Sequence, residues 1–224
     1  TKNHLSAIQD LSTIPLAKYS KEIYPDVHGD RKFKLFFLDE SRGCPMECAF
    51  CISRCIAGEQ WRVRKTEQIL EQMNGIMKTC HSNSFRFSGT YTPPAHVSEI
   101  CNAITAKKMK VKFGLFLHSR GINKELPLQL SKAGCYGVFV GVESGSNTIL
   151  NKYMNKGTSK EMLEFALKGA LDAGLHTVGT FIFPAPFESE ESEKETKQFI
   201  RSVFMGREKA VIGTSFPLLL PYST

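Results

Sequence analysis

The chain has 224 residues, of which 42% are hydrophobic and 10% aromatic, and its formal net charge is +7 at pH 7. This length fits one large domain or two small ones, and the composition allows a substantial core. No apolar stretch is long enough to span a membrane, and the first ten residues, TKNHLSAIQD, are unlike a signal peptide. The basic residues are spread out apart from Arg62, Arg64 and Lys65, which favours a solvated basic surface over a nucleic-acid groove without excluding nucleic acid.

Residues 1–32 are predicted to be a connector, because Pro15, Pro25, Gly29 and scattered charges interrupt any hydrophobic period. Residues 33–224 are expected to form the core domain. The chain begins with Thr1 and stops abruptly at PLLLPYST, so we expect it to be part of a longer protein.

Six short apolar segments in the core domain are predicted to be β-strands. They are nearly continuous or alternating in hydrophobicity, as buried strands are. The predicted strands are Phe33–Leu38, Ser84–Phe87, Val111–Leu117, Tyr136–Val142, Thr177–Phe183 and Val211–Leu220.

Five helices are predicted between these strands, where apolar residues recur at helical spacing. They contain Ile69–Met77, Val97–Ile104, the segment after Asn123, Met162–Ala170 and Phe199–Phe204, while Ile52–Lys65 is predicted to be a loop or a broken helix. Asn123 is a plausible N-cap, and Thr158 with Glu161 forms a predicted capping box. Gly134 and Gly174 are expected to end their helices.

Strands that alternate with helices form a parallel sheet through right-handed crossovers. A closed eight-fold barrel needs about 250 residues. The six units here therefore predict an α/β fold, a partial (β/α)6 TIM-like barrel with parallel strands. Such sheets bind ligands at the carboxyl ends of their strands, so the polar residues just after each strand are the candidate site residues.

The stretch Gly43–Cys51, GCPMECAFC, follows the first predicted strand and carries Cys44, Cys48 and Cys51 at spacing C-x3-C-x2-C. Three thiolates on one short loop can hold three irons of a [4Fe-4S] cluster and leave the fourth iron open, whereas electron-transfer clusters use four cysteines. A zinc site completed by Cys55 is the main rival. Structural zinc sites, however, usually take their ligands as two separated pairs.

The other cysteines lie apart in the sequence and fit ordinary packing positions, since a free cysteine behaves as a small hydrophobe. They are Cys55, Cys80, Cys101 and Cys135. Lone cysteines together with a thiolate motif favour a reducing compartment, so a cytoplasmic location is expected.

The cysteine spacing, with Phe50 just before the last cysteine, resembles the radical S-adenosylmethionine (SAM) superfamily. The sequence GVES at Gly141–Ser144 resembles its cobalamin-dependent subfamily, and DLSTIPLAKYS at Asp10–Ser20 is similar to the linker that follows the cobalamin-binding domain there. The resemblance implies that the three cysteines ligate the cluster, that the open iron chelates SAM, that Phe50 contacts the cofactor and that cobalamin is a further cofactor.

The resemblance also implies roles for three strand ends. Ser88, Gly89 and Thr90 are expected to receive the amine of methionine, although the acidic residue that many members carry is absent, and a plain turn is the alternative. Arg120 is expected to bind the methionine carboxylate or to pair with Glu143. Glu143 is expected to bind the ribose hydroxyls, with a structural ion pair as the alternative.

The adenine end of SAM is assigned by the same resemblance to Ile182 and the segment that follows it. Pro184 and Phe187 replace the two glycines of the usual Gly-x-Pro-Gly-Glu-Thr, which puts the backbone course over the adenine in doubt. Pro217–Thr224 resembles the proline-rich segment beside the adenine, without its usual Pro-Gly-Thr ending.

By this resemblance, one electron from the reduced cluster cleaves SAM to methionine and a 5′-deoxyadenosyl radical, which takes hydrogen from a substrate. Methyl transfer to an unactivated carbon is the expected outcome, with a small-molecule or peptide substrate, an external one-electron reductant and no membrane partner. A radical methylthiotransferase acting on tRNA or protein is the alternative enzyme. A zinc-stabilised binding module without catalysis is the alternative from another class.

Replacing Cys44 by Ala is expected to abolish the cluster, whereas Cys55→Ala should leave it intact, because only the first is a predicted ligand. Metal analysis and visible absorbance after anaerobic reconstitution measure this. Bound zinc without a brown chromophore, with binding that depends on Cys55, would contradict the cluster assignment.

Overall fold

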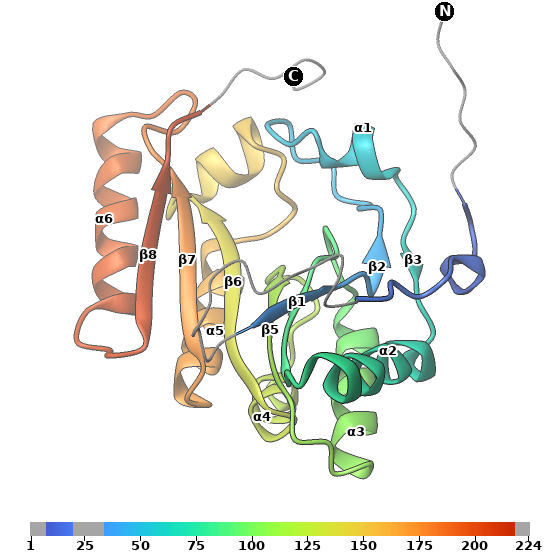
Figure 1. The fold of residues 1–224 in the computed structure, drawn as a ribbon. Coiled ribbons are helices and arrows are strands. Elements are labelled where there is room, and N and C mark those ends of the chain that lie inside the picture. Colours follow the sequence, from blue (N-terminus) through green and yellow to red (C-terminus); the bar gives the residue numbers. More distant parts are fainter. Residues whose placement is uncertain (1–7, 20–33, 218–224) are drawn as a thin grey trace, which may run out of the picture.

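The protein, seen here as a computed structural model that describes residues 8–19 and 34–217, is built on one six-stranded parallel sheet (Figure 1). The spatial order of the strands is β1-β4-β5-β6-β7-β8, which follows the chain. Their bounds are β1 Leu35–Leu38, β4 Ser84–Phe87, β5 Lys112–Leu117, β6 Cys135–Glu143, β7 His176–Ile182 and β8 Ala210–Ser215.

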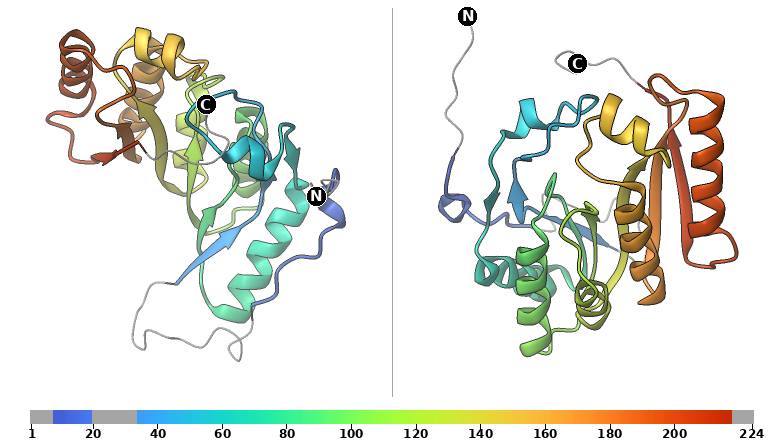
Figure 2. Two further views of the ribbon diagram at one scale, coloured as in Figure 1. Left: turned by 90° about the horizontal axis from the view of Figure 1, so that it is seen from above. Right: turned by 180° about the vertical axis from the view of Figure 1, so that it is seen from behind.

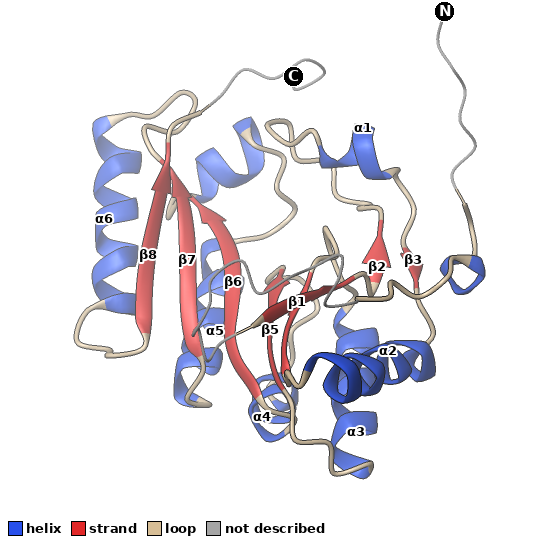
Figure 3. Cartoon of the chain, viewed as in Figure 1, coloured by secondary structure: helices blue, strands red, loops and turns tan. Residues whose placement is uncertain are grey.

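Five long helices connect consecutive strands, as the sequence predicted. They are α2 Thr66–Cys80, α3 Pro94–Ala106, α4 Glu125–Lys132, α5 Lys160–Asp172 and α6 Glu190–Phe204 (Figure 3). Seen from above, the strands form an open arc with these helices on its outer side (Figure 2). The edge strands β1 and β8 do not pair with each other. The predicted partial (β/α)6 barrel is therefore confirmed.

The main core lies between the outer face of the arc and the helices. Alternate strand residues such as Phe113, Leu115 and Leu117 on β5 are buried there, because successive side chains of a strand point to opposite faces. The rings of Phe87 and Phe113 stack with their centroids 5.0 Å apart. The opposite, inner face of the arc is more open, and Phe116 on the same strand is 48% exposed.

Helix α5 begins one residue later than the sequence predicted, so the capping box at Thr158 and Glu161 is wrong. The N-cap is Ser159, whose hydroxyl accepts a hydrogen bond from the Met162 N–H. The Thr158 hydroxyl is instead buried against Ser119 Oγ at 2.5 Å, just after β5. The Thr158 hydroxyl, which the local sequence pattern assigned to the helix cap, thus forms a hydrogen bond with a residue distant in the sequence.

Several short elements have no strong sequence signal. A two-stranded antiparallel sheet pairs β2 Ser41–Arg42 with β3 Arg62–Val63. Helix α1 Ser53–Ala57 comes between these two strands in the sequence. The prediction of a loop or broken helix for Ile52–Lys65 agrees with this. The last strand ends at Ser215, and the part of the predicted Val211–Leu220 strand beyond residue 217 lies outside the described residues.

The described part of the predicted connector packs against the core domain. Residues 8–19 include the short 3-10 helix η1 Leu11–Thr13, in which Leu11 is buried. Arg64 Nη1 donates to the Ile14 carbonyl at 2.9 Å, and Gln68 Nε2 donates to the Ser12 carbonyl at 3.1 Å. The remainder of the predicted connector, residues 1–7 and 20–32, is outside the described residues.

None of the helices in the described ranges is long and apolar enough to cross a membrane.

Phe113→Ala is expected to lower the free energy of unfolding by about 3–5 kcal/mol, because it opens a cavity in the main core. The matched change Phe165→Ala, on a ring that is 43% exposed on α5, should cost less than about 1 kcal/mol. Urea unfolding followed by circular dichroism measures both. Equal losses would mean that the core does not lie between sheet and helices.

Candidate functional site

The cysteine loop lies at the carboxyl end of β1 and is closed at its base by the β2–β3 pair (Figure 1). Gly43 begins the loop at a φ of +86°, and a Cβ there would lie 2.0 Å from the Gln60 carbonyl oxygen. Only glycine fits at this position, where the backbone has a positive φ and passes close to the Gln60 carbonyl. The Cys44 N–H donates to the Gly58 carbonyl at 3.0 Å, which fixes the first cysteine to the end of α1.

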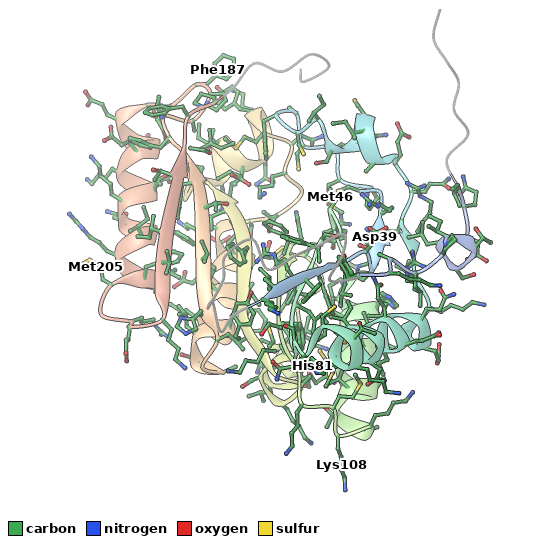
Figure 4. All side chains as sticks on the ribbon, in the orientation of Figure 1. Asp39, Met46, His81, Lys108, Phe187 and Met205 are labelled. Carbon is green, nitrogen blue, oxygen red and sulfur yellow. The ribbon has the colours of Figure 1, made fainter. Side chains whose placement is uncertain are left out.

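The other side of the loop is tied to the segment after β6, which begins with the π-helix η2 Ile149–Tyr153. The Ala49 N–H donates to the Met154 carbonyl at 2.9 Å. Asn155 Nδ2 donates to the Glu47 carbonyl at 3.1 Å. In Figure 4, Met46 of the loop and Phe187 after β7 lie on the side of the molecule where the strands end.

One cleft at this edge gathers residues from the loop and from the ends of several strands. Six of the predicted site residues line it, namely the three cysteines, Phe50, Thr90 and Glu143. The complete lining is Cys44, Met46, Cys48, Phe50, Cys51, Ser53, Thr90, Tyr91, Phe116, Leu117, His118, Phe139, Gly141, Glu143 and Lys156.

Cys55 is exposed on α1 and does not line the cleft. Cys80, Cys101 and Cys135 are buried, as ordinary packing residues are. Within residues 8–19 and 34–217, no group of three or more His, Cys, Asp or Glu side chains is arranged to hold a single metal ion.

The three loop cysteines are half-buried and influence one another electrostatically. Burial raises the pKa of the Cys48 thiol to about 11, and the nearby Lys156 ammonium lowers it. Burial likewise raises the pKa of Cys44, against a smaller lowering by Lys156. Cys44 and Cys48 therefore stay protonated until a metal displaces their protons, and Lys156 favours the thiolates that metal binding requires.

Glu143 forms a buried ion pair with Lys156 at 3.0 Å, so the predicted pairing of Glu143 with Arg120 is wrong. Glu143 adopts a φ of +66°, an uncommon backbone conformation for a non-glycine residue. A Cβ at Gly141 would lie 2.4 Å from Glu143 Oε1 and 3.2 Å from Lys156 Nζ. The strand end is thus shaped around the ion pair, and the ribose contact of Glu143 stays a prediction.

In the Ser88–Thr90 turn, the first two residues bind the Glu40 carboxylate and the third lines the cleft. The N–H groups of Ser88 and Gly89 donate to the Glu40 carboxylate at 3.0 Å, and Thr92 Oγ1 donates to it at 2.6 Å. A Cβ at Gly89 would meet Ser41 Oγ at 2.0 Å and Glu40 Oε1 at 2.4 Å. Ser88 and Gly89 do not line the cleft, and Thr90 does.

Glu40 is an acidic residue that the sequence analysis did not single out. It is 1% exposed, and burial raises its pKa to about 7 despite the hydrogen bonds that lower it. It supplies a carboxylate from the end of β1 to the turn after β4, where the sequence lacks an acidic residue of its own. Its place just after a predicted strand marks Glu40 as a strand-end residue, but nothing in the sequence links it to the turn after β4.

His118 is a second residue to which the sequence gave no role. Its Nδ1 accepts a hydrogen bond from the Arg120 N–H at 3.1 Å, so Nε2 carries the proton of the neutral ring. Nε2 is buried and makes no well-aligned hydrogen bond among the described residues, although the Lys156 backbone lies close enough to raise the pKa of the ring. Burial first, and then Lys156, lowers the pKa of His118 to about 4. The cleft wall therefore contains a neutral donor.

The remaining predicted residues lie near the cleft without lining it. Arg120 is exposed just beyond β5, and its carboxylate role stays a prediction. Ile182 and Phe50 both pack against a small cluster made of Ile149, Met154 and Ala185. This cluster joins the cysteine loop to the end of β7.

Downstream of β7, Glu188 has a structural role, since its carboxylate accepts from the Ala185 N–H at 2.7 Å and closes the turn. The predicted adenine segment Pro217–Thr224 lies outside the described residues after Pro217.

Comparison with known proteins gives consistent matches. The family model for the radical SAM superfamily matches residues 41–200. An uncharacterized methyltransferase of Pyrococcus horikoshii is 26% identical over 94% of this chain and 46% of its own length. Bacteriochlorophyllide d C-8(2)-methyltransferase of Chlorobaculum tepidum is 27% identical over 90% of this chain and 46% of its own length. The chain thus spans less than half the length of these relatives.

A solved structure shares the fold. The radical SAM methyltransferase TsrM of Kitasatospora setae, with cobalamin and a [4Fe-4S] cluster bound, superposes with a TM-score of 0.73 at 19% identity. The superposition covers 84% of this chain and 38% of that chain.

The stability of the protein is expected to fall as the pH rises from 5 to 8, because a buried acid with a raised pKa is protonated in the folded state and must ionise. Burial raises the pKa of Glu40 from its ordinary 4.5 to about 7. The contribution of Glu40 to the free energy of unfolding is therefore complete below pH 4.5 and is lost as the pH passes 7. The free energy of unfolding falls by about 3 kcal/mol over this range. Urea unfolding at both pH values measures it.

Glu40→Gln keeps a side chain of the same shape that does not titrate, so it serves as the matched control. Its stability should change less between pH 5 and 8 than that of the parent. The same pH dependence in both proteins would show that Glu40 is not buried as an acid.

Proposed function

The chain belongs to the radical SAM superfamily, and on that premise we propose that it cleaves SAM reductively and transfers a methyl group to an unactivated carbon with the help of cobalamin. The single observation that carries this proposal is the cleft at the carboxyl edge of the sheet. It is lined by Cys44, Cys48 and Cys51 together with the strand-end residue Glu143. The exposed Cys55 lies apart from it.

The donor set suits the cluster that the family uses. Three cysteines on one loop, with a buried ammonium close by, provide thiolate ligands and a charge that compensates them. We assign Cys44, Cys48 and Cys51 as the ligands. When bound, a [4Fe-4S] cluster with one open iron supplies the electron that breaks the sulfonium C–S bond of SAM.

The remaining lining fits an elongated, polar ligand beside the cysteines. Thr90 and the His118 Nε2–H offer hydrogen bonds near the loop, and Glu143 offers a carboxylate for the ribose hydroxyls. Phe50 and Ile182 provide apolar contacts. These groups hold the cofactor in one orientation and exclude water, which is the protein's share of such chemistry.

Methyl transfer is favoured by the names of the two curated relatives and of the TsrM structure. The cobalamin is assigned to a part of the protein outside this sequence. Residues 1–32 are proposed to connect that domain to the barrel, and residues 33–224 to form the radical SAM core. A D-x-H-x-x-G cobalamin motif upstream of Thr1 in the full-length protein would support this, and its absence would favour another radical reaction.

The proposal also names partners and a compartment. A small molecule or peptide is the substrate, and an external one-electron reductant delivers electrons to the cluster. Free cysteines and a half-buried cysteine site favour a reducing compartment, and the cytoplasm is the compartment we propose.

The full-length protein, reconstituted anaerobically with iron and sulfide, is expected to convert SAM to methionine and 5′-deoxyadenosine when dithionite is added. Mass spectrometry of the products measures this. With cobalamin present, the deuterated methyl group of labelled SAM should appear on cobalamin before it reaches any substrate. A brown, cluster-loaded protein that leaves SAM intact would contradict the proposed function.

Glu143→Gln is expected to weaken SAM binding by about tenfold, because it removes the charge from a hydrogen bond to the ribose. Glu125→Gln, which changes an exposed carboxylate on α4 outside the cleft, is the matched control and should bind SAM like the parent. Equilibrium dialysis on the cluster-loaded proteins measures both, and equal affinities would remove Glu143 from the ribose site.

A further inference from the structure

Arg86 is a charged residue on the inner face of the arc that neither the sequence analysis nor the proposed function uses. It lies on β4 between Phe85 and Phe87, whose rings are buried in the main core. Because strand side chains alternate, Arg86 points to the inner face. The residue is only 9% exposed.

The guanidinium lies against two aromatic rings, one on the adjacent strand β5 and the other on β6. Its Cζ is 3.7 Å from the ring centroid of Phe139 and 4.4 Å from that of Phe116. Both rings also line the cleft that contains the cysteines. Arg86 therefore packs against two side chains of the cleft wall.

Tyr136 completes the arrangement, and the backbone of β5 is adapted to it. The Tyr136 phenol lies close enough to the Arg86 guanidinium to raise the pKa of Arg86. Gly114 on β5 pairs with Arg86, and a Cβ at Gly114 would lie 2.9 Å from the Tyr136 ring and hydroxyl. Because Gly114 has no side chain, the Tyr136 phenol can pass over β5 and approach Arg86.

Arg86 makes no ion pair within the described part of the chain, although Tyr136 first, and then Cys135 and Glu40, raise its pKa. No carboxylate of residues 8–19 or 34–217 lies within 4.0 Å of it. Burial lowers the pKa of Arg86, which reflects the cost of keeping its charge away from water. Two ring faces, a phenol and the more distant Glu40 carboxyl compensate this cost only in part, because a buried cation is stable when an anion pairs directly with it.

We propose that Arg86 and Tyr136 form an anion-binding subsite that holds a carboxylate or phosphate group of the substrate inside the barrel. The inference rests on the proposed function, since the substrate is the molecule that has to enter the barrel beside the cysteine cleft. A guanidinium stacked on rings keeps its N–H edge free to form paired hydrogen bonds with either group. The phenol hydroxyl adds a further donor.

The test is calorimetric titration of the full-length, cluster-loaded protein with inorganic phosphate and, separately, with acetate, each with saturating SAM present. Saturable binding of one anion is expected, and the tighter of the two identifies the class of substrate group. Arg86→Gln should weaken that binding by at least about tenfold, and Tyr136→Phe by a smaller factor. Lys112→Gln removes an exposed charge from β5 and should leave it unchanged.

Three results would overturn the inference. The first is that the parent protein binds neither anion saturably, and the second is that the two single variants, Arg86→Gln and Tyr136→Phe, both bind the anion as tightly as the parent. The third is anion binding that appears only when SAM is absent. The last would assign the subsite to the cofactor. Since Tyr136→Phe removes a single hydroxyl, it keeps the test valid if Arg86→Gln does not fold. Cleavage of SAM by a parent protein that binds no anion would refute the subsite alone, and anion binding without cleavage would refute the proposed function alone.

Discussion

Three half-buried thiols on one loop must lose their protons together when they bind a metal cluster, and the protein has to compensate the charge that results. Burial alone opposes this, because it raises the pKa values of Cys44 and Cys48. Lys156 is the cation that acts in the other direction. It is held in place by Glu143, so the cysteine loop and the end of β6 form one electrostatic unit.

Much of the local backbone follows from this unit. Gly141 leaves the space that the Glu143–Lys156 pair fills, and Glu143 itself takes a left-handed conformation at the strand end. Gly43 lets the loop pass close to Gln60. Hydrogen bonds from Ala49 and Asn155 join the loop to the segment after β6, so the cysteines are fixed against the residues that carry the compensating charge.

The strands, their order and the cysteine loop could be predicted because they depend on local signals. Buried strands have apolar runs, and three cysteines at a fixed spacing need no partner elsewhere to be noticed. The errors concern contacts between distant residues. Thr158 bonds with Ser119 instead of capping α5, Glu143 pairs with Lys156 instead of Arg120, and nothing in the sequence around Glu40 announces that it binds the turn after β4.

The central claim is that the loop cysteines hold a cluster whose open iron binds SAM. Electron paramagnetic resonance of the dithionite-reduced, full-length protein tests it most directly, with spectra recorded before and after SAM is added. The reduced protein is expected to give the signal of a [4Fe-4S] cluster whose g values shift when SAM binds at the open iron. A cluster signal that SAM leaves unchanged, or a protein that holds zinc and gives no signal, would contradict it.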